Sequence, residues 1–227
     1  MPTAQRHVSK GLCSFCKESF NKTVITRHLT ACRSHETRSK AVSLHSKPRA
    51  TRFFHLIVQG RYSPGYWMHL EIPRDATLKD LDQFLRDTWL ECCGHLSSFV
   101  IEGERYATTP MMEEEDMEEE SMEVALSKVL RPGMTFYHQY DYGSTTELTL
   151  RVLSEREGAA NKNSVLILAR NEPPARACES CGKAATQVCC ECKEVICSSC
   201  LRKHACESEM FIPLVNSPRA GVCGYTG

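Results

Sequence analysis

The spacing of the cysteines near the C-terminus constrains this chain more than any other feature of its sequence. Three Cys-x2-Cys pairs follow one another, and a histidine comes after the last pair. The two thiolates of such a pair can occupy adjacent corners of a tetrahedron, the arrangement in which Zn²⁺ binds four sulfur or nitrogen ligands. We therefore expect a structural module that holds two zinc ions over residues 173–227. Its candidate ligands are Cys178, Cys181, Cys189, Cys192, Cys197, Cys200, His204, Cys206 and Cys223.

This spacing is similar to that of B-box and RING-like modules, in which alternate ligand pairs share a metal ion. The resemblance implies a cross-brace, with one site formed by Cys178, Cys181, Cys197 and Cys200 and another by Cys189, Cys192, His204 and one further cysteine. That last ligand is either Cys206 or Cys223. A sequential arrangement is the alternative, but one of its sites would take His204 and Cys206, which lie only two positions apart. Cys190 is expected to bind no metal.

A second Cys/His unit lies near the N-terminus, within residues 1–36. Its candidate ligands are Cys13, Cys16, His28 and Cys32. The pattern resembles a CCHC variant of the ββα zinc finger, with Phe20 and Ile25 as a small core and residues 22–32 as the helix. It is one residue short between the second cysteine and the histidine. With the C-terminal module, this unit predicts about three zinc ions in the chain.

The charges are distributed unevenly although they sum to zero over the whole chain. Residues 1–52 hold 11 Lys and Arg but 2 Asp and Glu, whereas residues 53–172 hold 11 against 21. We interpret residues 37–51 as a basic linker and expect residues 1–52 to contact DNA or RNA. A merely solvated arm would have the same composition. The candidate phosphate contacts are Lys22, Arg27, Arg33 and Arg38.

The region 52–172 has the pattern of an α+β domain. Two β-rich runs, 52–59 and 66–72, predict a hairpin. Apolar residues spaced by three and four over 78–89 predict an amphipathic helix capped by Thr77 or Asp75. Further strands are expected at 98–101, 105–106, 134–140, 147–153 and 164–169, with a second helix at 122–130. This order predicts a central, largely antiparallel sheet with two helices, flanked by small zinc-binding modules.

An acidic run at residues 113–120 separates the two expected helices. Its like charges cannot pack against one another, which favours a solvated loop. The alternative is that the run docks on the basic arm and masks it.

The middle region, over residues 53–157, resembles the plasmid Ri-type ORF-three-like family, which includes insertion-element passenger proteins of TnpR type. The residues that carry the resemblance are Trp67, Ile72-Pro73, Asp75, Thr77-Leu78, Leu81, Trp89, His95-Leu96, Phe99, Gly103, Tyr106, Leu130, Pro132-Gly133 and Tyr140-Asp141-Tyr142-Gly143. The family implies an α+β domain often found near mobile elements, without an established reaction. Many members have Asp, Trp and His where this chain has Ser144, Thr146 and Leu148, so chemistry centred there is in doubt.

No catalytic residue is assigned. An enzyme could use Cys92 and Cys93 with His95, or Asp141 with Ser144, but proximity in sequence does not establish a site. We expect the Cys92–Cys93 pair to be buried and inert. Catalytic zinc keeps one coordination position open, whereas each expected site has four protein ligands. The pattern therefore favours a non-enzymatic, nucleic-acid-associated zinc protein; a protein-interaction adaptor acting through the zinc modules is the alternative.

The N-terminal residues lack the apolar segment of a secretory signal, and no apolar run approaches the roughly 20 residues that span a bilayer. We therefore expect a soluble intracellular protein without a membrane partner, cytoplasmic, or nuclear in a eukaryote. Thiols stay reduced in these compartments, where clustered cysteines more often bind metal than form disulfides.

Overall fold

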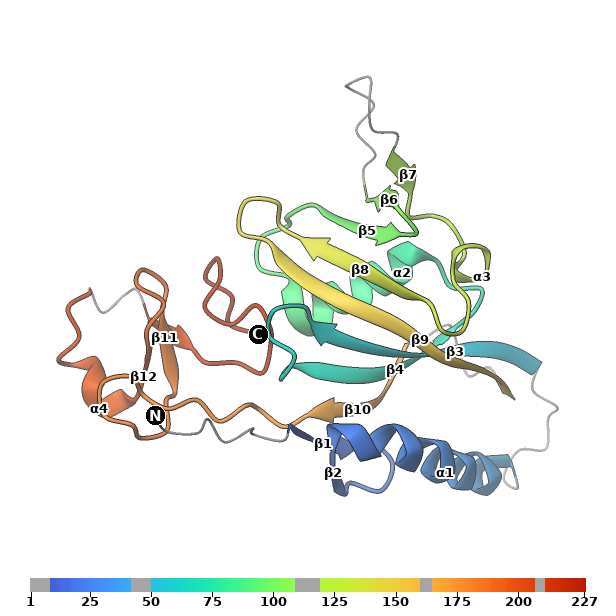
Figure 1. Cartoon of the computed structure of the whole chain (residues 1–227), viewed down its shortest axis with the longest axis horizontal. Coiled ribbons are helices and arrows are strands. Elements are labelled where there is room, and N and C mark those ends of the chain that lie inside the picture. Colours follow the sequence, from blue (N-terminus) through green and yellow to red (C-terminus); the bar gives the residue numbers. More distant parts are fainter. Residues whose placement is uncertain (1–8, 42–49, 109–118, 160–164, 207–210) are drawn as a thin grey trace, which may run out of the picture.

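The computed structural model describes residues 9–41, 50–108, 119–159, 165–206 and 211–227, with side chains described in these ranges except at 33–41, 50 and 159. Within them a ten-stranded sheet dominates the fold (Figure 1). In spatial order its strands are β2 (Ser19–Asn21), β1 (Lys10–Cys13), β10 (Leu166–Asn171), β4 (Trp67–Pro73), β3 (Ala50–Gly60), β9 (Thr146–Ala159), β8 (Thr135–Tyr140), β5 (Ser97–Ile101), β6 (Glu104–Ala107) and β7 (Glu119–Ser121). All neighbours are antiparallel except β6 and β7. The predicted α+β class is confirmed.

The expected hairpin is β3 and β4, paired from Phe53 opposite Pro73 to Gln59 opposite Trp67. All seven residues of β4 are buried because both faces of the strand are covered. Met68 and its alternate neighbours join the large core, whereas Trp67 packs with residues of the N-terminal segment. Successive side chains of a strand point to opposite faces, so β4 belongs to two cores at once.

The first predicted helix is present and begins where expected. Helix α2 (Leu78–Leu85) is capped by Thr77, whose side chain accepts a hydrogen bond from the Asp80 backbone while the Asp80 carboxylate accepts one from the Thr77 backbone. This capping box satisfies two amide groups that the first turn would leave unpaired. A π-helical turn, η1 (Arg86–Leu90), continues the helix and places Trp89 in the large core.

The second predicted helix is wrong over half its length, since α3 covers only Leu126–Val129. The preceding residues, expected to be helical, form a turn and a bend whose carbonyl groups accept hydrogen bonds from the start of α2. Lys79 donates its backbone N–H to the Met122 carbonyl, and Leu78 donates to the Val124 carbonyl. These tertiary hydrogen bonds override the local helix pattern, whose propensity is worth only a few tenths of a kcal/mol per residue.

The N-terminal helix, by contrast, is longer than expected. Helix α1 spans Lys22–Ala41, so it includes the first part of the segment interpreted as a linker. Most of the acidic run lies outside the described residues. Its last two residues, Glu119 and Glu120, are not in a solvated loop but in β7, where Glu119 forms an ion pair with Arg105 at 2.9 Å.

The N-terminal segment is part of the sheet because β1 lies between β2 and β10. Cys13 pairs opposite Ala169 and Gly11 opposite Asn171. Helix α1 lies beside β1 and β10 (Figure 1), and its Ile25 and Leu29 share a core with Leu168 of β10. None of the helices in the described part of the chain has the length and apolar character needed to cross a membrane.

Gly11 is the position where this contact is tightest. An added β carbon would collide with the Trp67 ring and lie 2.6 Å from the Arg170 carbonyl oxygen. We expect Gly11→Ala to lower the free energy of unfolding by about 1–3 kcal/mol, as overpacking of a filled core does. Urea denaturation checks this, with Gly65→Ala as the control because a β carbon there meets nothing closer than 3.7 Å. Equal stability of the two variants would contradict the tight packing at Gly11.

The C-terminal module has its own small sheet, ordered β12 (Val195–Ile196), β11 (Gln187–Cys189) and β13 (Phe211–Pro213), with a short helix α4 (Ser198–Leu201). After β13 the chain returns to the central domain. There the Ser217 hydroxyl donates to the Trp89 carbonyl at 2.7 Å, and the Arg219 side chain is fully buried. We call residues 214–227 the tail.

Candidate metal centres

Cysteine and histidine side chains gather into four clusters among the described residues. Within each cluster the potential ligand atoms all lie within 4.8 Å of one another. The clusters are Cys13, Cys16, His28 and Cys32; Cys178, Cys181, Cys197 and Cys200; Cys189, Cys192, His204 and Cys206; and Cys92, Cys93, His95 and Cys223. Tetrahedral zinc with bonds of about 2.3 Å to sulfur and about 2.0 Å to nitrogen separates neighbouring ligands by about 3.5–3.8 Å.

The measured separations fit such a coordination sphere. Cys13 Sγ lies 3.9 Å from Cys32 Sγ, and Cys181 Sγ lies 3.6 Å from Cys197 Sγ. A disulfide would require about 2.05 Å, and all the cysteines are free thiols. The donor sets suit zinc, since three clusters offer three soft thiolates and one imidazole and the fourth offers four thiolates. The four clusters are therefore compatible with metal binding, one more than the three sites that the sequence predicted.

The N-terminal cluster joins a hairpin to a helix. Cys13 ends β1, Cys16 lies in the turn before β2, and His28 and Cys32 are one turn apart on α1. Cys16 Sγ is 3.4 Å from His28 Nε2. Phe20 stacks on the His28 ring with centroids 3.8 Å apart, which fixes the imidazole. All four residues expected from the sequence are brought together.

The second cluster combines the first and third Cys-x2-Cys pairs, as the cross-brace requires. A hydrogen bond from the Cys197 backbone is the largest of the effects that lower the pKa of the Cys178 thiol, to about 6. The hydrogen bond with Cys181 is the largest of those that raise the pKa of Cys200, to about 12. Four neighbouring thiolates repel one another unless a cation lies between them, and a metal ion supplies that charge.

The third cluster combines the middle pair with His204 and Cys206, so Cys206 takes the position that the sequence left open. Cys192 Sγ lies 3.4 Å from His204 Nε2. The Glu194 carboxylate lies 3.3 Å from the other ring nitrogen, Nδ1, and so orients Nε2 toward the thiols. Cys190 belongs to none of the four clusters.

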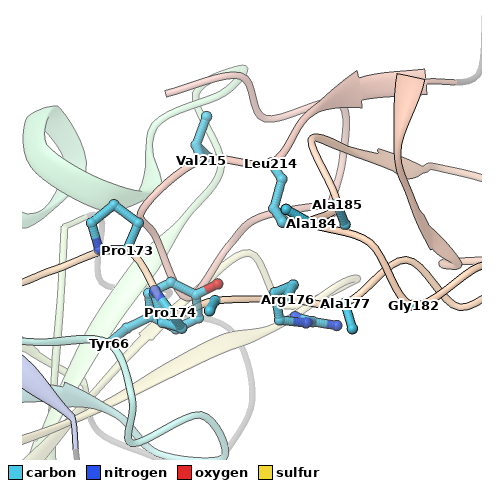
Figure 2. Close-up of a pocket in the computed structure, with 11 residues that line it drawn as sticks. Tyr66, Pro173, Pro174, Arg176, Ala177, Gly182, Ala184, Ala185, Leu214 and Val215 are labelled. Atoms are coloured by element: carbon cyan, nitrogen blue, oxygen red, sulfur yellow. The ribbon is translucent and has the colours of Figure 1, made fainter. Parts of the chain in front are cut away.

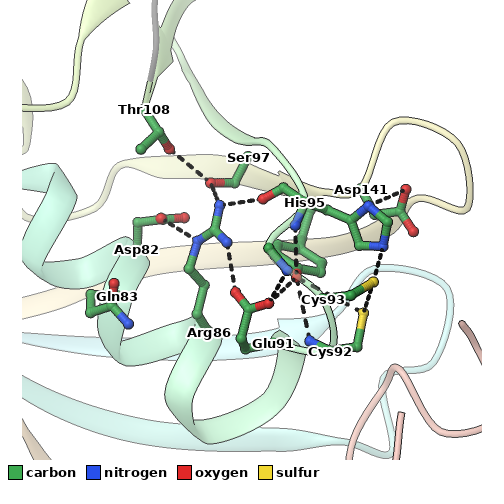
Figure 3. Close-up of polar contacts among 12 residues, drawn as sticks. Asp82, Gln83, Arg86, Glu91, Cys92, Cys93, His95, Ser97, Thr108 and Asp141 are labelled. Carbon is green, nitrogen blue, oxygen red and sulfur yellow. Dashed lines mark hydrogen bonds and ion pairs between the residues drawn. The ribbon is translucent and has the colours of Figure 1, made fainter. Parts of the chain in front are cut away.

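The fourth cluster was not predicted. Cys92 and Cys93 were expected to be buried and inert, but Cys93 is exposed and its Sγ lies 2.9 Å from His95 Nε2 (Figure 3). Cys223, a candidate for the C-terminal module, lies here instead, 3.7 Å from Cys93 Sγ. The available signal was the Cys-Cys-x-His pattern, together with Cys223, a candidate ligand that has no place in the C-terminal module once Cys206 completes the third cluster.

The loop that carries three of these ligands is held by a polar network. The Arg86 guanidinium donates to the Glu91 carboxylate at 2.7 Å and to the His95 carbonyl at 2.6 Å (Figure 3). The Tyr140 hydroxyl donates to Glu91 at 2.9 Å. Burial would raise the pKa of Glu91, but hydrogen bonds from the Gly94 backbone and from Arg86 outweigh it and lower that pKa. The loop is therefore fixed independently of any metal.

Two members of the candidate catalytic set lie close together, since the Asp141 carboxylate is 3.6 Å from His95 Nδ1. Asp141 Oδ1 accepts backbone hydrogen bonds from Gly143 and Ser144 at 3.0 and 3.2 Å. The described cleft, of about 460 Å³, lies elsewhere (Figure 2). Its lining has no cysteine, histidine or carboxylate among the described residues: Tyr66, Pro173, Pro174, Ala175, Arg176, Ala177, Gly182, Ala184, Ala185, Leu214 and Val215.

The four candidate phosphate-contacting residues all lie on α1. Lys22 is half-buried and donates to the Gln59 side chain at 2.6 Å and to the Pro64 carbonyl at 3.0 Å, so its ammonium group contacts the β3–β4 hairpin. Burial lowers the pKa of Lys22. Arg27 is exposed. The side chains of Arg33 and Arg38 lie outside the described ones.

The fold and the clusters together define an α+β protein whose Cys/His clusters fit zinc. The sequence matches the model of plasmid pRiA4b ORF-3-like proteins over residues 57–186, more than half of the chain and past the first Cys-x2-Cys pair of the C-terminal module. The chain therefore belongs to this family, as the resemblance in its sequence implied.

The chain was also compared with curated sequences and with solved structures. No curated protein sequence matches the chain. The crystal structure of a protein of unknown function, MM3350 from Methanosarcina mazei Go1, is similar with a TM-score of 0.46 and 16% sequence identity, over 53% of this chain and 70% of that one.

Proposed function

We propose that the protein is a non-catalytic zinc protein that binds DNA or RNA through the exposed face of α1. The N-terminal cluster supports this proposal because it follows the plan of a ββα finger of CCHC type, with the hairpin β1–β2 leading into α1. Fingers of this plan contact bases with the residues at positions −1, 3 and 6 relative to the helix start. With Lys22 as position 1, those residues are Asn21, Val24 and Arg27.

The observation that carries the proposal is the exposure of all three positions. Asn21 and Arg27 are exposed, and Val24 keeps 40% of its surface accessible although it is apolar. The buried side of the same helix holds Ile25 and Leu29 against Trp67. The finger thus joins the sheet through one side and leaves the recognition side open.

The chemistry of these side chains suits a nucleic acid. Arg27 can donate two hydrogen bonds to guanine, Asn21 can pair with adenine, and Val24 can contact a thymine methyl group. Residues 22–41 carry five Lys and Arg and one Glu, which favours contact with phosphate. One finger presents a small interface, so we expect micromolar affinity that falls steeply with salt. Each of the other clusters offers four protein ligands, which suits structural rather than catalytic zinc.

Fluorescence anisotropy of labelled duplex DNA and of RNA, titrated with the zinc-loaded full chain, tests this function. Logarithmic affinity should fall with logarithmic salt concentration by about 0.9 per neutralised phosphate on DNA. Arg27→Ala should either weaken binding by about 1–3 kcal/mol, if Arg27 contacts a base, or reduce the salt slope by about one, if it contacts phosphate. Deleting residues 1–52 is a poorer test because β1 belongs to the sheet.

The matched control is Arg131→Ala. Arg131, which precedes β8, is also exposed and forms an ion pair with Glu102. Because it lies far from α1 in the sequence, the Arg131→Ala substitution should leave nucleic-acid binding unchanged. Equal losses in the two variants would remove α1 as the contact surface. No binding by the wild-type chain at low salt would instead favour the protein-interaction adaptor.

A further inference from the structure

We propose that the fourth cluster binds Zn²⁺ and thereby fastens the tail to the central domain. We call Cys92, Cys93, His95 and Cys223 the clasp. Three of its members lie in the loop after η1, and Cys223 approaches from the tail, 128 positions after His95. It contains no Cys-x2-Cys pair, unlike the other three clusters. A metal ion here would join two distant segments instead of shaping one local module.

The geometry fits a closed site of three thiolates and one imidazole. Cys92 Sγ lies 3.6 Å from Cys93 Sγ, and His95 Nε2 lies 3.3 Å from Cys223 Sγ. Both are near the edges of a zinc tetrahedron. The other ring nitrogen of His95, Nδ1, faces the Asp141 carboxylate at 3.6 Å. A carboxylate on that side favours Nε2 as the metal ligand, because outer partners of this kind orient the histidines of zinc sites.

The charges around the clasp also favour a bound zinc ion. Zinc with three thiolates and a neutral imidazole carries one net negative charge. The fully buried Arg219 guanidinium lies 3.3 Å from Cys92 Sγ and 2.7 Å from Asp141 Oδ2. Arg219 and Cys223 are four positions apart, so the tail brings both a ligand and the cation that balances the complex. A buried charge without such partners would be strongly unfavourable.

Metal binding at the clasp would also restrain the C-terminal module, because the tail contacts both. The tail also contacts that module, where the Lys193 ammonium group donates to the Gly221 carbonyl at 3.2 Å and a β carbon at Gly221 would meet Val188 at 2.9 Å. The clasp therefore fixes the tail between the central sheet and the module. It is also the most open of the four clusters, since every other cluster has at least one fully buried cysteine and the clasp has none.

Metal analysis of the reduced, purified full chain tests the site. We expect four zinc ions per wild-type chain and three in Cys223→Ser and in Cys93→Ser, which remove a ligand from either side of the clasp. Cys190→Ser is the matched control and should keep four. Cys93 and Cys223 are both exposed, so neither substitution disturbs the core. Three zinc ions in the wild type, or four in both clasp variants, would overturn the proposal.

Limited trypsin digestion tests the fastening. Cleavage after Arg219 requires the tail to leave its site, because the Arg219 side chain is fully buried. Proteolysis follows the population of the open form, and we expect release of residues 220–227 to be about tenfold faster or more in the two clasp variants than in Cys190→Ser. Variants that lose one zinc ion but keep the wild-type cleavage rate would show that the metal does not hold the tail.

Discussion

Replacing Cys181 or Cys200 with alanine should unfold the C-terminal module, which then loses both of its zinc ions, while the ten-stranded sheet stays folded. The module has little else to hold it, since its small core contains mainly Cys178, Ile196 and Cys197. Structural zinc supplies about 10–16 kcal/mol in such sites, and an unfolded module does not present the four ligands together. Metal analysis should show the loss of the module's two ions, and hydrogen exchange should show loss of protection confined to β11, β12 and β13.

Cys190→Ala is the control for this experiment because Cys190 lies in the same module but outside the clusters. It should keep the wild-type metal content and exchange pattern. Wild-type protection of the module in Cys181→Ala would show that metal is not what holds it, and loss of metal in Cys190→Ala would reverse the ligand assignment.

Asp82→Asn should destabilise the central domain by about 3–5 kcal/mol. The buried Asp82 carboxylate accepts hydrogen bonds from His138 Nε2 and from the Arg86 guanidinium, both at 2.7 Å. The substitution removes the more deeply buried of the two carboxylates that pair with the Arg86 guanidinium, and it leaves Glu91 as the other. Urea denaturation at neutral pH with zinc present measures the loss. Asp87→Asn, an exposed position on the adjoining turn, should change stability by less than about 0.5 kcal/mol.

The same pair of proteins gives a pH test. Burial would raise the pKa of Asp82, but the His138 hydrogen bond and the Arg86 charge outweigh it, so the pKa lies below its usual value. The unfolded chain therefore binds the proton more readily, and the stabilising contribution is complete above about pH 4 and lost as the pH falls through the folded-state pKa. The stability difference between wild type and Asp82→Asn should shrink in that range; a constant difference would contradict the role of the charge.

Local patterns in the sequence predicted much of this structure. The hairpin β3–β4 and the Thr77 cap of α2 follow from residues that are neighbours in the chain, and so does the helix that follows Phe20 in the N-terminal unit. Three of the four Cys/His clusters carry their own spacing signal, because Cys-x2-Cys pairs bring two ligands together within a single turn.

The features that sequence reasoning missed depend on contacts between distant segments. Cys223 meets Cys93 only because the tail returns to the sheet, and no local spacing encodes that return. The start of the second predicted helix is a turn and a bend because the Met122 and Val124 carbonyls accept hydrogen bonds from α2. Likewise, the strand at Gly11 joins the sheet through β10, more than 150 positions further along the chain. The need for glycine at position 11 becomes apparent only in the structure, where the Trp67 ring and the Arg170 carbonyl leave no room for a β carbon.

The place of β10 in the sheet also sets an order for folding. Strand β1 pairs with β2 and β10 and not with β4, so the N-terminal hairpin has no place in the sheet until residues 166–171 have been added. On the ribosome, the N-terminal Cys/His unit can close early from local contacts, while the Trp67 face of the hairpin β3–β4 remains open to solvent. Such late, long-range pairing is slow and leaves apolar surface exposed meanwhile. The ribosome must therefore synthesise residues 166–171 before β1 can pair with β10.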